Sequence, residues 1–423
     1  TFPSFSLGWN IKNESFMQDV PWISGLKLRA SWGVNGNDAI GDFTYAVYTS
    51  QNNNYVFGSP ATSEQITGGT KPSGLANPNV KWEESRQTDI GIDMAFFGNR
   101  LTFVADWYHK KTAGMLLSMP VPGYSGDSAP TGNLGDMLNQ GIELDLGYRN
   151  SAGDFNYHAS INATYNKNTL TYLGDDAPSL YCSNHQTGQL TRGLVGLPFP
   201  YFYGFKSDGI FQNMDEVKAY TNAEGNMIMP NAEPGDVRFV DIDGDGVIGD
   251  GDKTYIGKGI PDWVFGLNLG FDWKGLDFSI LLQGQLGAQA YNVSRRIDLG
   301  AVNLPKYMLN RWTGEGTTNK YPKFEVGDAT NYVVSDVWVE DASFLRARNV
   351  QLGYTLPPNI TKKFFVQRLR VYAQAENLFT LTRYQGCDPE VTGGNSSYGT
   401  EVGIDRGVYP QSRTFSVGVN LTF

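Results

Sequence analysis

Apolar and polar residues alternate strictly along residues 413–423. One row of this stretch is apolar and consists of Phe415, Val417, Val419, Leu421 and Phe423. The intervening row is small or polar and consists of Ser416, Gly418, Asn420 and Thr422. Successive side chains of a strand point to opposite faces of its sheet, so the pattern predicts a β-strand between two different environments. A strand on the core of a soluble sandwich and a lipid-facing strand of a membrane barrel would both show it.

The same alternation recurs along the rest of the chain. It is found in residues 5–11, 26–32, 89–96, 101–108, 142–148, 155–165, 265–273, 276–283, 349–356 and 369–376. With the last stretch this makes about eleven predicted strands, each close to the roughly 9–11 residues that cross a bilayer when tilted. Their polar rows carry charges at Asp89, Asp93, Asp106, Glu143, Asp145, Asp272, Asp277, Arg370 and Glu376. So many consecutive charged rows favour a wet or plugged lumen over one face of a soluble sheet.

The connections between these strands alternate in length. Short ones fall at 13–25, 97–100, 150–154, 274–275 and 357–368, and long ones at 34–85, 112–140, 167–261, 287–342 and 382–412. Short turns on one side and long loops on the other are typical of an outer-membrane barrel. A soluble sandwich rarely has loops longer than about 15 residues. The predicted fold class is therefore an all-β, antiparallel transmembrane barrel with long extracellular loops and short periplasmic turns.

Composition supports this fold class. Charged residues make up 18% of the chain and aromatic residues 13%, whereas an average soluble protein has about 25% charged residues. No apolar run approaches the roughly 18 residues of a membrane-spanning helix. The net charge of −10 argues against nucleic acid as a partner. The two cysteines, Cys182 and Cys387, are too few for a disulfide framework, and whether they pair stays open.

An odd number of strands has a consequence for the whole barrel. Bacterial single-chain barrels have an even number of strands, and an open half-barrel would leave bare edges in lipid. We therefore expect at least one further strand upstream, and about eleven strands fit half of a 22-stranded transporter with a plugged lumen. Residue 1 lies in a strand-like stretch and no signal peptide precedes it, so residues 1–423 are expected to be a fragment.

One stretch departs from the regular alternation. Continuing the strand of Val350 toward lower numbers places Arg348 and Arg346 on the lipid side. A charge there costs about 2–4 kcal/mol at the bilayer midplane and little near the interface. We predict either an interfacial position or a β-bulge near Asn349 that returns residues 345 and 347 to the outer face.

Several segments resemble one known family. FPSFSLGW at 2–9, GLKLRASWGVNGN at 25–37, FLRARNVQLGYTLP at 344–357 and LRVYAQAENLF at 369–379 resemble the C-terminal barrel of SusC/RagA-family TonB-dependent transporters. CDPEV at 387–391 resembles it too, although the family more often has tyrosine at the position of Cys387. The resemblance extends over the whole chain, 1–423, which it identifies as the C-terminal half of a barrel that lacks its plug domain and N-terminal strands.

This resemblance implies a biological role. It implies an outer-membrane importer of a Bacteroidota-type Gram-negative bacterium, with a 22-stranded barrel around an N-terminal plug, embedded in outer-membrane lipid. Such importers are energised by TonB, work with a SusD-like surface lipoprotein, and take up oligosaccharides or peptides too large for porins. The plug and TonB box are missing from 1–423, so this segment is not expected to transport alone. By the same resemblance, Phe423 is the terminal aromatic residue that barrel assembly recognises.

The predicted extracellular loop 167–261 contains a motif for calcium. In DIDGDGVIGDGD at 241–252, carboxylates stand at positions 1, 3 and 5 of a twelve-residue loop of the EF-hand type. The predicted ligands are Asp241, Asp243, Asp245, the backbone carbonyl of Val247, and Asp252. Position 12 is normally glutamate; here it is the shorter aspartate, and residue 250 could compete with it. Glycine and acidic residues surround the loop, which predicts a structural Ca²⁺ site without flanking helices, whereas an acidic turn without metal is the alternative.

The long loops are also rich in aromatic residues. These are Tyr181, Phe199, Tyr201, Phe202, Tyr203, Phe211, Tyr291, Trp312, Tyr332, Trp338, Tyr384, Tyr398 and Tyr409. Exposed aromatic rings beside polar side chains suit the binding of sugars or peptides. Packing of the loops against one another, or contact with a capping protein, explains them equally well. No individual substrate-binding residue can be named from the sequence.

Three functional classes remain to be compared. The leading hypothesis is TonB-dependent import, and the alternative is a passive porin-like or structural surface barrel. An outer-membrane enzyme is the third. His109, His158 and His185 are scattered, and neither G-x-S-x-G nor H-E-x-x-H occurs, so no catalytic residues are predicted.

Overall fold

The largest unit of the described structure is one curved sheet. The structure is a computed structural model that describes residues 1–40, 42–51, 54–57, 65–72, 74–118, 124, 130–174, 179–185, 188–294, 299–328, 330–391 and 399–423. Within these residues the sheet has twelve strands: β1 (Ser4–Asn10), β2 (Ile23–Asn37), β7 (Glu83–Phe96), β8 (Leu101–Ser118), β9 (Thr131–Ala152), β10 (Phe155–Leu173), β17 (Trp263–Trp273), β18 (Leu276–Leu286), β21 (Phe344–Thr355), β22 (Arg368–Glu376), β23 (Thr380–Thr382) and β25 (Thr414–Thr422).

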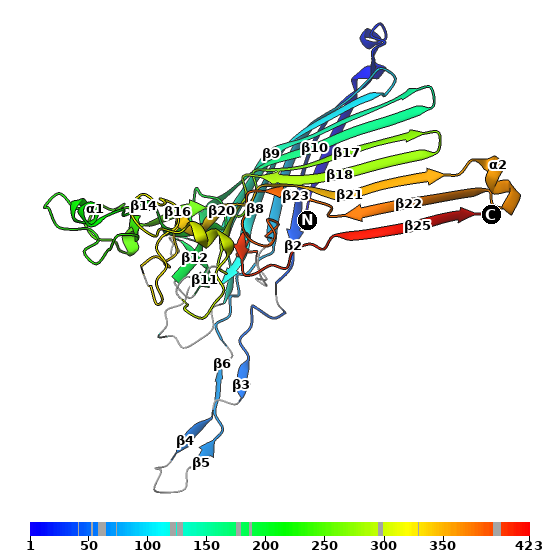
Figure 1. The fold of residues 1–423 in the computed structure, drawn as a ribbon. Helices are drawn as coiled ribbons and strands as arrows, with labels where there is room; N and C mark the ends of the chain where they lie inside the picture. Colours follow the sequence, from blue (N-terminus) through cyan, green and yellow to red (C-terminus); the bar gives the residue numbers. More distant parts are fainter. Residues whose placement is uncertain are drawn as a thin grey trace.

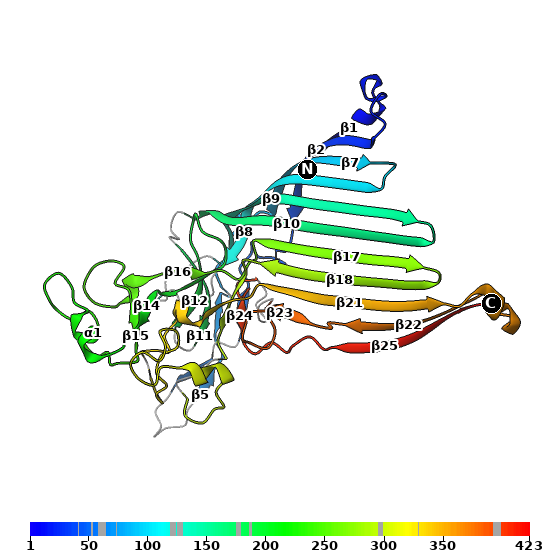
Figure 2. The same cartoon turned by 45° about the horizontal axis from the view of Figure 1, so that its top comes forward.

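The strands pair in sequence order. Eleven of the described strands follow one another from β1 to β25, each antiparallel to its neighbours. The short strand β23 pairs with the first three residues of β21, 344–346. The predicted count of about eleven membrane strands is thereby confirmed. Figure 2 shows them side by side, with β1 and β25 at the two edges of the wall.

Short and long connections lie at opposite ends of the wall, as Figure 1 shows. We call these the turn end and the loop end. At the turn end, residues 274–275 connect β17 to β18 in two residues, Lys274 with φ 47° and Gly275 with φ 89°. Positive φ at both positions belongs to the turn that matches the twist of a hairpin. The C terminus also lies at the turn end, as expected for the last strand (Figure 1).

The outer face of the wall is apolar and exposed. Across seven strands, paired positions form the row Trp9, Leu28, Ile92, Ala105, Leu144, Ala163 and Phe265. Side chains such as Leu7 and Val417 are 76% and 81% exposed. An apolar surface that continues across so many strands is suited to lipid rather than water.

On the inner face, an ion pair crosses over a complete strand. Arg29 of β2 reaches past β7 to Asp106 of β8, with Nη2 2.9 Å from Oδ2, and also binds Asp93 of β7. Position 91, which lies between them on β7, is glycine. A Cβ added to Gly91 would stand 2.0 Å from Asp106 Oδ1, so the pair depends on the missing side chain.

A second pair repeats this arrangement farther along the sheet. Arg370 of β22 passes over β21 and donates through Nε to Asp277 Oδ1 of β18 at 2.9 Å. Gly353 of β21 lies beneath, and a Cβ there would be 2.5 Å from Arg370 Nη2. Glycine therefore sits in both polar rows to make space for an arginine that lies flat along the wall.

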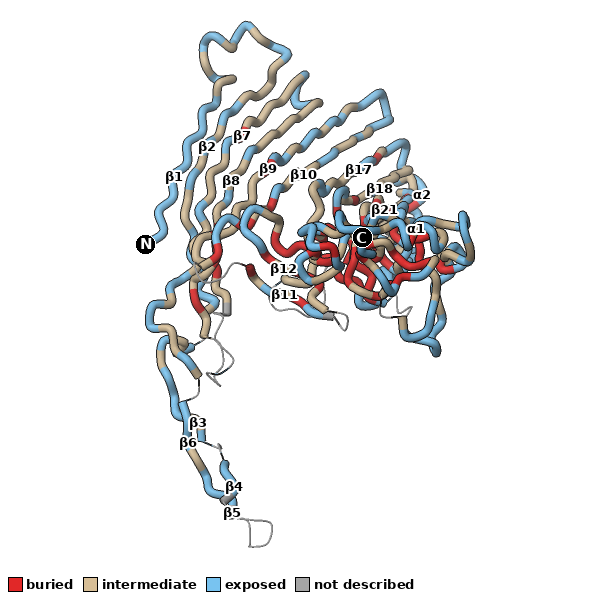
Figure 3. The backbone as a smooth tube through the Cα atoms, turned by 90° about the vertical axis from the view of Figure 1, so that its left-hand side faces the viewer, coloured by how far each residue is buried: buried red, intermediate tan, exposed pale blue. Residues whose placement is uncertain are grey.

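The loop end carries a folded assembly of its own. Its strands form small sheets: β11 (Leu180–His185), β12 (Gly188–Gly193), β13 (Tyr201–Phe205) and β16 (Lys253–Gly257); β14 (Ser207–Ile210) and β15 (Val237–Phe239); β19 (Gln289–Asn292), β20 (Val339–Asp341) and β24 (Ile404–Asp405). An extended arm consists of β3 (Thr49–Gln51) with β6 (Thr70–Pro72) and β4 (Tyr55–Phe57) with β5 (Gln65–Thr67), and projects away from the rest (Figure 1). Figure 3 shows that buried residues gather in the loop assembly rather than in the wall.

Helices are few and short in the described residues. They are α1 (Met214–Ala219) in the loop assembly and α2 (Pro358–Thr361) at the turn end. No helix in the part of the chain described here is long and apolar enough to cross a membrane.

Several strands extend beyond the stretches that alternation predicted. Alternation indicated 142–148, whereas β9 runs from Thr131 to Ala152, and β10 continues to Leu173. Most of the added residues lie toward the loop end, where β9 pairs with both β8 and β10, and residues 149–152 extend β9 at the turn end. Pairing can continue there although the polar and apolar rows are lost, because outside the lipid both faces of a strand can carry either kind of residue. The connection predicted at 167–261 therefore begins after Leu173.

Replacing Gly91 tests the pair that crosses β7. We expect Gly91→Ala to destabilise the folded wall by about 1–3 kcal/mol, because its Cβ displaces the Asp106 carboxylate. The measurement is the temperature at which the folded form is lost on a heat-modifiability gel. In an Asp106→Ala background the same replacement should cost much less. An equal cost in both backgrounds would show that the crossing pair is not what Gly91 accommodates. Gly314→Ala, at a position with nothing within 4 Å, is the control.

Candidate functional site

The acidic loop 241–252 lies between β15 and β16 in the loop assembly. It ends in a 3-10 turn, Asp250–Asp252, and strands rather than helices flank it. Carboxylate oxygens of Asp241, Asp243 and Asp252 all lie within 4.8 Å of one another. Oxygens this close can share a centre about 2.8 Å from each, near the ~2.3–2.6 Å of calcium–oxygen bonds.

Backbone N–H groups hold two of these carboxylates in place. Asp252 is 1% exposed, and it accepts from the N–H of Ile242 at 2.6 Å and of Gly249 at 2.7 Å. Asp241 accepts from the N–H of Gly246 at 3.0 Å. Gly246 has φ 84°, a conformation that favours glycine and that forms the sharp turn expected at this position. Two of the three carboxylates are thus positioned by the fold of the loop itself.

Two other acidic residues of the loop, Asp245 and Asp250, do not belong to this close group. Asp250 is 95% exposed and binds Lys253 Nζ at 2.6 Å, and this hydrogen bond lowers the pKa of Asp250. Asp252, not Asp250, therefore belongs to the converging group. Asp245 lies outside that group, and its Oδ1 accepts from the N–H of Val247 at 2.9 Å.

The predicted bulge is present on β21 and is confirmed. The register of β21 against β18 steps from Asn349 to Ala347, which leaves Arg348 as the extra residue. Beyond the bulge, Ala347 and Leu345 pair with the outer row of β18, and Arg346 pairs with its inner row. Both arginines are thereby removed from the lipid face.

Inside, the two arginines bind the connection between β23 and β25. Arg346 is 2% exposed, and its Nη2 lies 2.6 Å from Asp388 Oδ1 and its Nη1 3.0 Å from Glu390 Oε2. Arg348 Nη2 lies 2.6 Å from the same Glu390 carboxylate. We call Arg346, Arg348, Asp388 and Glu390 the arginine latch, because it fixes a long connection to the wall.

Burial opposes the charge on Asp388, yet the pKa of this carboxyl is lowered. The N–H groups of Gln411 and Glu390 and the guanidinium of Arg346 stabilise the carboxylate. The sequence shows the two arginines as a departure from the strand pattern and 387–391 as a family motif, but it does not show that they contact each other. Two charged residues on one strand, without opposite charges on the neighbouring strands, are the feature that could have indicated a partner in a loop.

The structure divides the loop aromatics into two groups. Phe202 and Phe211 are fully buried, Trp338 is 1% and Tyr201 2% exposed, so these rings pack the loop assembly. Tyr181 and Tyr409 are 70% and 83% exposed, and these rings are available to a ligand or partner. Tyr398 lies outside the described residues. Packing of the loops therefore accounts for the buried rings, and binding stays a prediction for the exposed ones.

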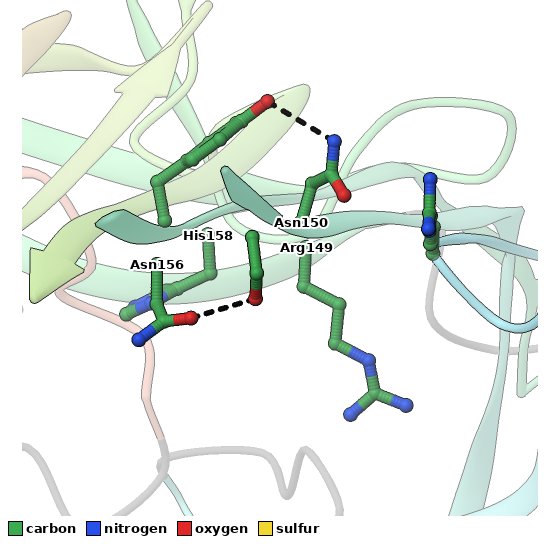
Figure 4. Close-up of a pocket in the computed structure, with 7 residues that line it drawn as sticks. Arg149, Asn150, Asn156 and His158 are labelled. Atoms are coloured by element: carbon green, nitrogen blue, oxygen red, sulfur yellow. Dashed lines mark hydrogen bonds between the residues drawn. The ribbon is translucent and has the colours of Figure 1, made fainter. Parts of the chain in front are cut away.

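A polar hollow lies near the turn end of β9 and β10. It measures about 520 Å³ and is lined by Arg100, Arg149, Asn150, Ser151, Asn156, Tyr157 and His158. Figure 4 shows hydrogen bonds among its side chains, including one from Ser151 Oγ to Asn156 Oδ1 at 2.6 Å. This hollow lies far from the acidic loop, at the opposite end of the wall.

The two cysteines are not bonded to each other. Both are free thiols, Cys182 partly buried and Cys387 exposed. Burial raises the pKa of the Cys182 thiol to about 12, which keeps it protonated and unreactive near neutral pH.

Comparison with known proteins gives a consistent result. The profile of the family described as "TonB dependent receptor-like, beta-barrel" matches residues 1–378. TonB-dependent receptor P3 of Formosa agariphila is 33% identical over 431 residues, which cover all of this chain and 42% of that protein. TonB-dependent receptor SusC of Bacteroides thetaiotaomicron is 32% identical and is matched over 40% of its length.

Solved structures agree with these relatives. A structure of the RagAB peptide transporter superposes with a TM-score of 0.78 at 28% identity, over all of this chain and 43% of the other. The chain thus spans about two fifths of the length of the proteins it matches. The resemblance to SusC and RagA that the sequence suggested is confirmed.

Breaking the arginine latch should release the connection between β23 and β25. We expect Asp388→Asn to lower the free energy that holds this connection to the wall by about 3 kcal/mol. This value is at the lower end for a buried charge that loses its partner, because Glu390 still contacts Arg346. The measurement is the rate at which a protease cuts within residues 383–413. The control is Glu401→Gln in the same connection, whose partner Arg406 is more exposed.

The latch should also depend on pH with a defined sign. Because the native pKa of Asp388 lies below its ordinary 3.8, the latch is fully formed above that pH and is lost as the pH falls through the native value. If the protease cut the Asp388→Asn protein no faster than the wild type, the latch would not be what holds the connection between β23 and β25.

Proposed function

The chain belongs to the TonB dependent receptor-like β-barrel family, whose SusC and RagA relatives are outer-membrane proteins of Bacteroidota, and we propose that it forms part of an importer for nutrients too large for porins. The family is one of transporters and receptors rather than enzymes. The observation that carries the proposal is the wall itself, with an apolar outer face and a polar inner face across eleven paired strands of the described chain. Its loop end corresponds to the extracellular side.

The proposed importer needs parts beyond these residues. We propose that further strands close the barrel against β1 and β25, that a plug fills the lumen, and that TonB supplies energy through the plug segment. A SusD-like surface lipoprotein would cover the loop assembly, and the cargo would be an oligosaccharide or a peptide. The relationship to SusC and to the RagAB peptide transporter supports each of these.

Growth on the cargo tests the import function. In the native bacterium, cells that lack the complete gene should fail to take up the oligosaccharide or peptide that induces it, and so should cells that lack TonB. Accumulation of labelled cargo is the measurement. Uptake that continues without TonB, with the gene present, would indicate the passive barrel instead.

We further propose that the acidic loop binds Ca²⁺ as a structural ion. Asp241, Asp243 and Asp252 would supply carboxylate oxygens, with Asp245 and the Val247 carbonyl as the remaining ligands. Three converging carboxylates repel one another without a cation, and hard oxygen ligands suit calcium. The ion would order the connection between β15 and β16 and would take no part in transport chemistry.

Calcium titration of the complete protein tests this site. Calorimetry should give a dissociation constant in the range of about 10⁻⁴–10⁻³ M, typical of extracellular sites. Asp252→Asn should abolish the binding, because it removes the buried ligand. Asp250→Asn, on the exposed carboxylate paired with Lys253, should leave it unchanged. Equal loss in both variants, or no heat with the wild type, would contradict the proposal.

A further inference from the structure

One face of the sheet β11–β12–β13–β16 is covered by tyrosines around a single arginine. Arg192 pairs across strands with Tyr181 on one side and Tyr201 on the other, and Tyr203 pairs with Tyr255. Cross-strand partners point to the same side of a sheet. We call Tyr181, Arg192, Tyr201, Tyr203 and Tyr255 the tyrosine platform.

Three rings of the platform, those of Tyr201, Tyr203 and Tyr255, contact one another. The Tyr201 ring centroid lies 5.6 Å from that of Tyr255 and 6.4 Å from that of Tyr203. Tyr201 is 2% exposed and forms the base, whereas Tyr255 is 38% and Tyr181 70% exposed. The Tyr255 ring thus rests on the buried Tyr201 ring, whereas the Tyr181 ring contacts Arg192. Each exposed ring offers an apolar face and a hydroxyl group that can bond to a polar ligand.

Arg192 lies between two of these rings. Its guanidinium carbon is 5.3 Å from the Tyr181 ring centroid and 4.6 Å from that of Tyr203. Its Nη2 donates to Ser179 Oγ at 2.6 Å. The rings and this hydrogen bond fix the orientation of the cation, so little freedom remains to be lost when an anion binds.

No carboxylate of the described residues pairs with this guanidinium. Three other loop-end arginines do have such a partner: Arg238 pairs with Asp208 at 3.1 Å, Arg406 with Glu401 at 2.8 Å, and Arg346 with Asp388 at 2.6 Å. Among the residues described here, Arg192 forms no ion pair, and its Nε is buried without a hydrogen-bond partner. A cation held in place with no counter-ion among the described residues is suited to an anion that comes from outside.

We propose that the tyrosine platform binds an acidic oligosaccharide, with a pyranose ring on the tyrosines and its carboxylate or sulfate ester on Arg192. A pyranose has an apolar C–H face and a rim of hydroxyl groups, which matches rings that carry phenol hydroxyls. A guanidinium binds planar carboxylates and sulfate-like anions through paired N–H donors. An acidic peptide would satisfy the arginine but would not use several flat rings on adjacent strands. The inference rests on the proposed import function and narrows its cargo.

Binding of defined probes to the purified full-length transporter in detergent tests the inference. The probes are trigalacturonate, a sulfated carrageenan oligosaccharide of similar length, neutral maltotriose and tetraglutamate, each titrated by calorimetry. At least one of the two acidic oligosaccharides should bind tenfold or more tightly than maltotriose, and added salt should weaken it. The two acidic probes distinguish a carboxylate from a sulfate ester. Tighter binding of tetraglutamate, or equal binding of maltotriose, would overturn the assignment.

Substitutions separate the platform from general folding effects. Arg192→Gln should weaken acidic-sugar binding tenfold or more, and Arg192→Lys should recover only part of it, since lysine keeps the charge but not the planar fork. Tyr181→Ala, at a mostly exposed side chain, should weaken binding several-fold without affecting folding. The matched control is Arg238→Gln, whose arginine also lies over an aromatic ring but is paired with Asp208.

The outcomes also distinguish this inference from the import proposal. Binding in detergent needs no TonB. If the acidic oligosaccharide binds through Arg192 but cells take up the cargo without TonB, only the import proposal is overturned. TonB-dependent uptake with equal effects of Arg192→Gln and Arg238→Gln on binding would overturn only the platform. Heat-modifiable gel migration shows that each variant is folded.

Discussion

Backbone hydrogen bonding in a medium without water is the constraint on which this structure depends. Hydrocarbon offers no partner to an N–H or C=O group, so each strand inside the membrane must be paired on both sides. The continuous register from β1 to β25 meets this demand for every strand between the two edges. Alternation of side chains follows, because the fixed register assigns every second residue to lipid. The apolar row from Trp9 to Phe265 is the visible result.

Charges on such a wall must be turned inward and compensated there. The bulge at Arg348 does the first, because one added residue changes the face of every residue beyond it. The arginine latch does the second for Arg346, which is almost fully buried beside Asp388. The same latch connects the wall to a loop. A local correction of register thus also decides where the connection between β23 and β25 is attached.

The wall could be predicted from sequence, whereas the loop assembly could not. Period-two alternation is a local signal, and it located all eleven strands of the path and the bulge near Asn349. The strand ends were less accurate, as β9 shows, since pairing outside lipid needs no alternation. Contacts such as Arg346 with Asp388 join residues that are 42 positions apart, and no spacing rule connects them. The loop motif at 241–252 was predicted from its spacing, but the exclusion of Asp250 depended on the local 3-10 turn that brings its carboxylate to Lys253 three residues later.

The two arginines that lie across glycines have a consequence for anything that moves along the inner face. Arg29 and Arg370 neither project into the lumen nor leave their carboxylate partners exposed on their own. Each arginine therefore offsets part of the acidic charge on the inner face and adds little thickness to the wall beneath it. A solute on the inner face would therefore meet these two cations as paired groups that lie flat on the wall, not as free charges that stand out from it. Glycine at 91 and 353 leaves the space that this arrangement needs, although neither residue has a side chain of its own.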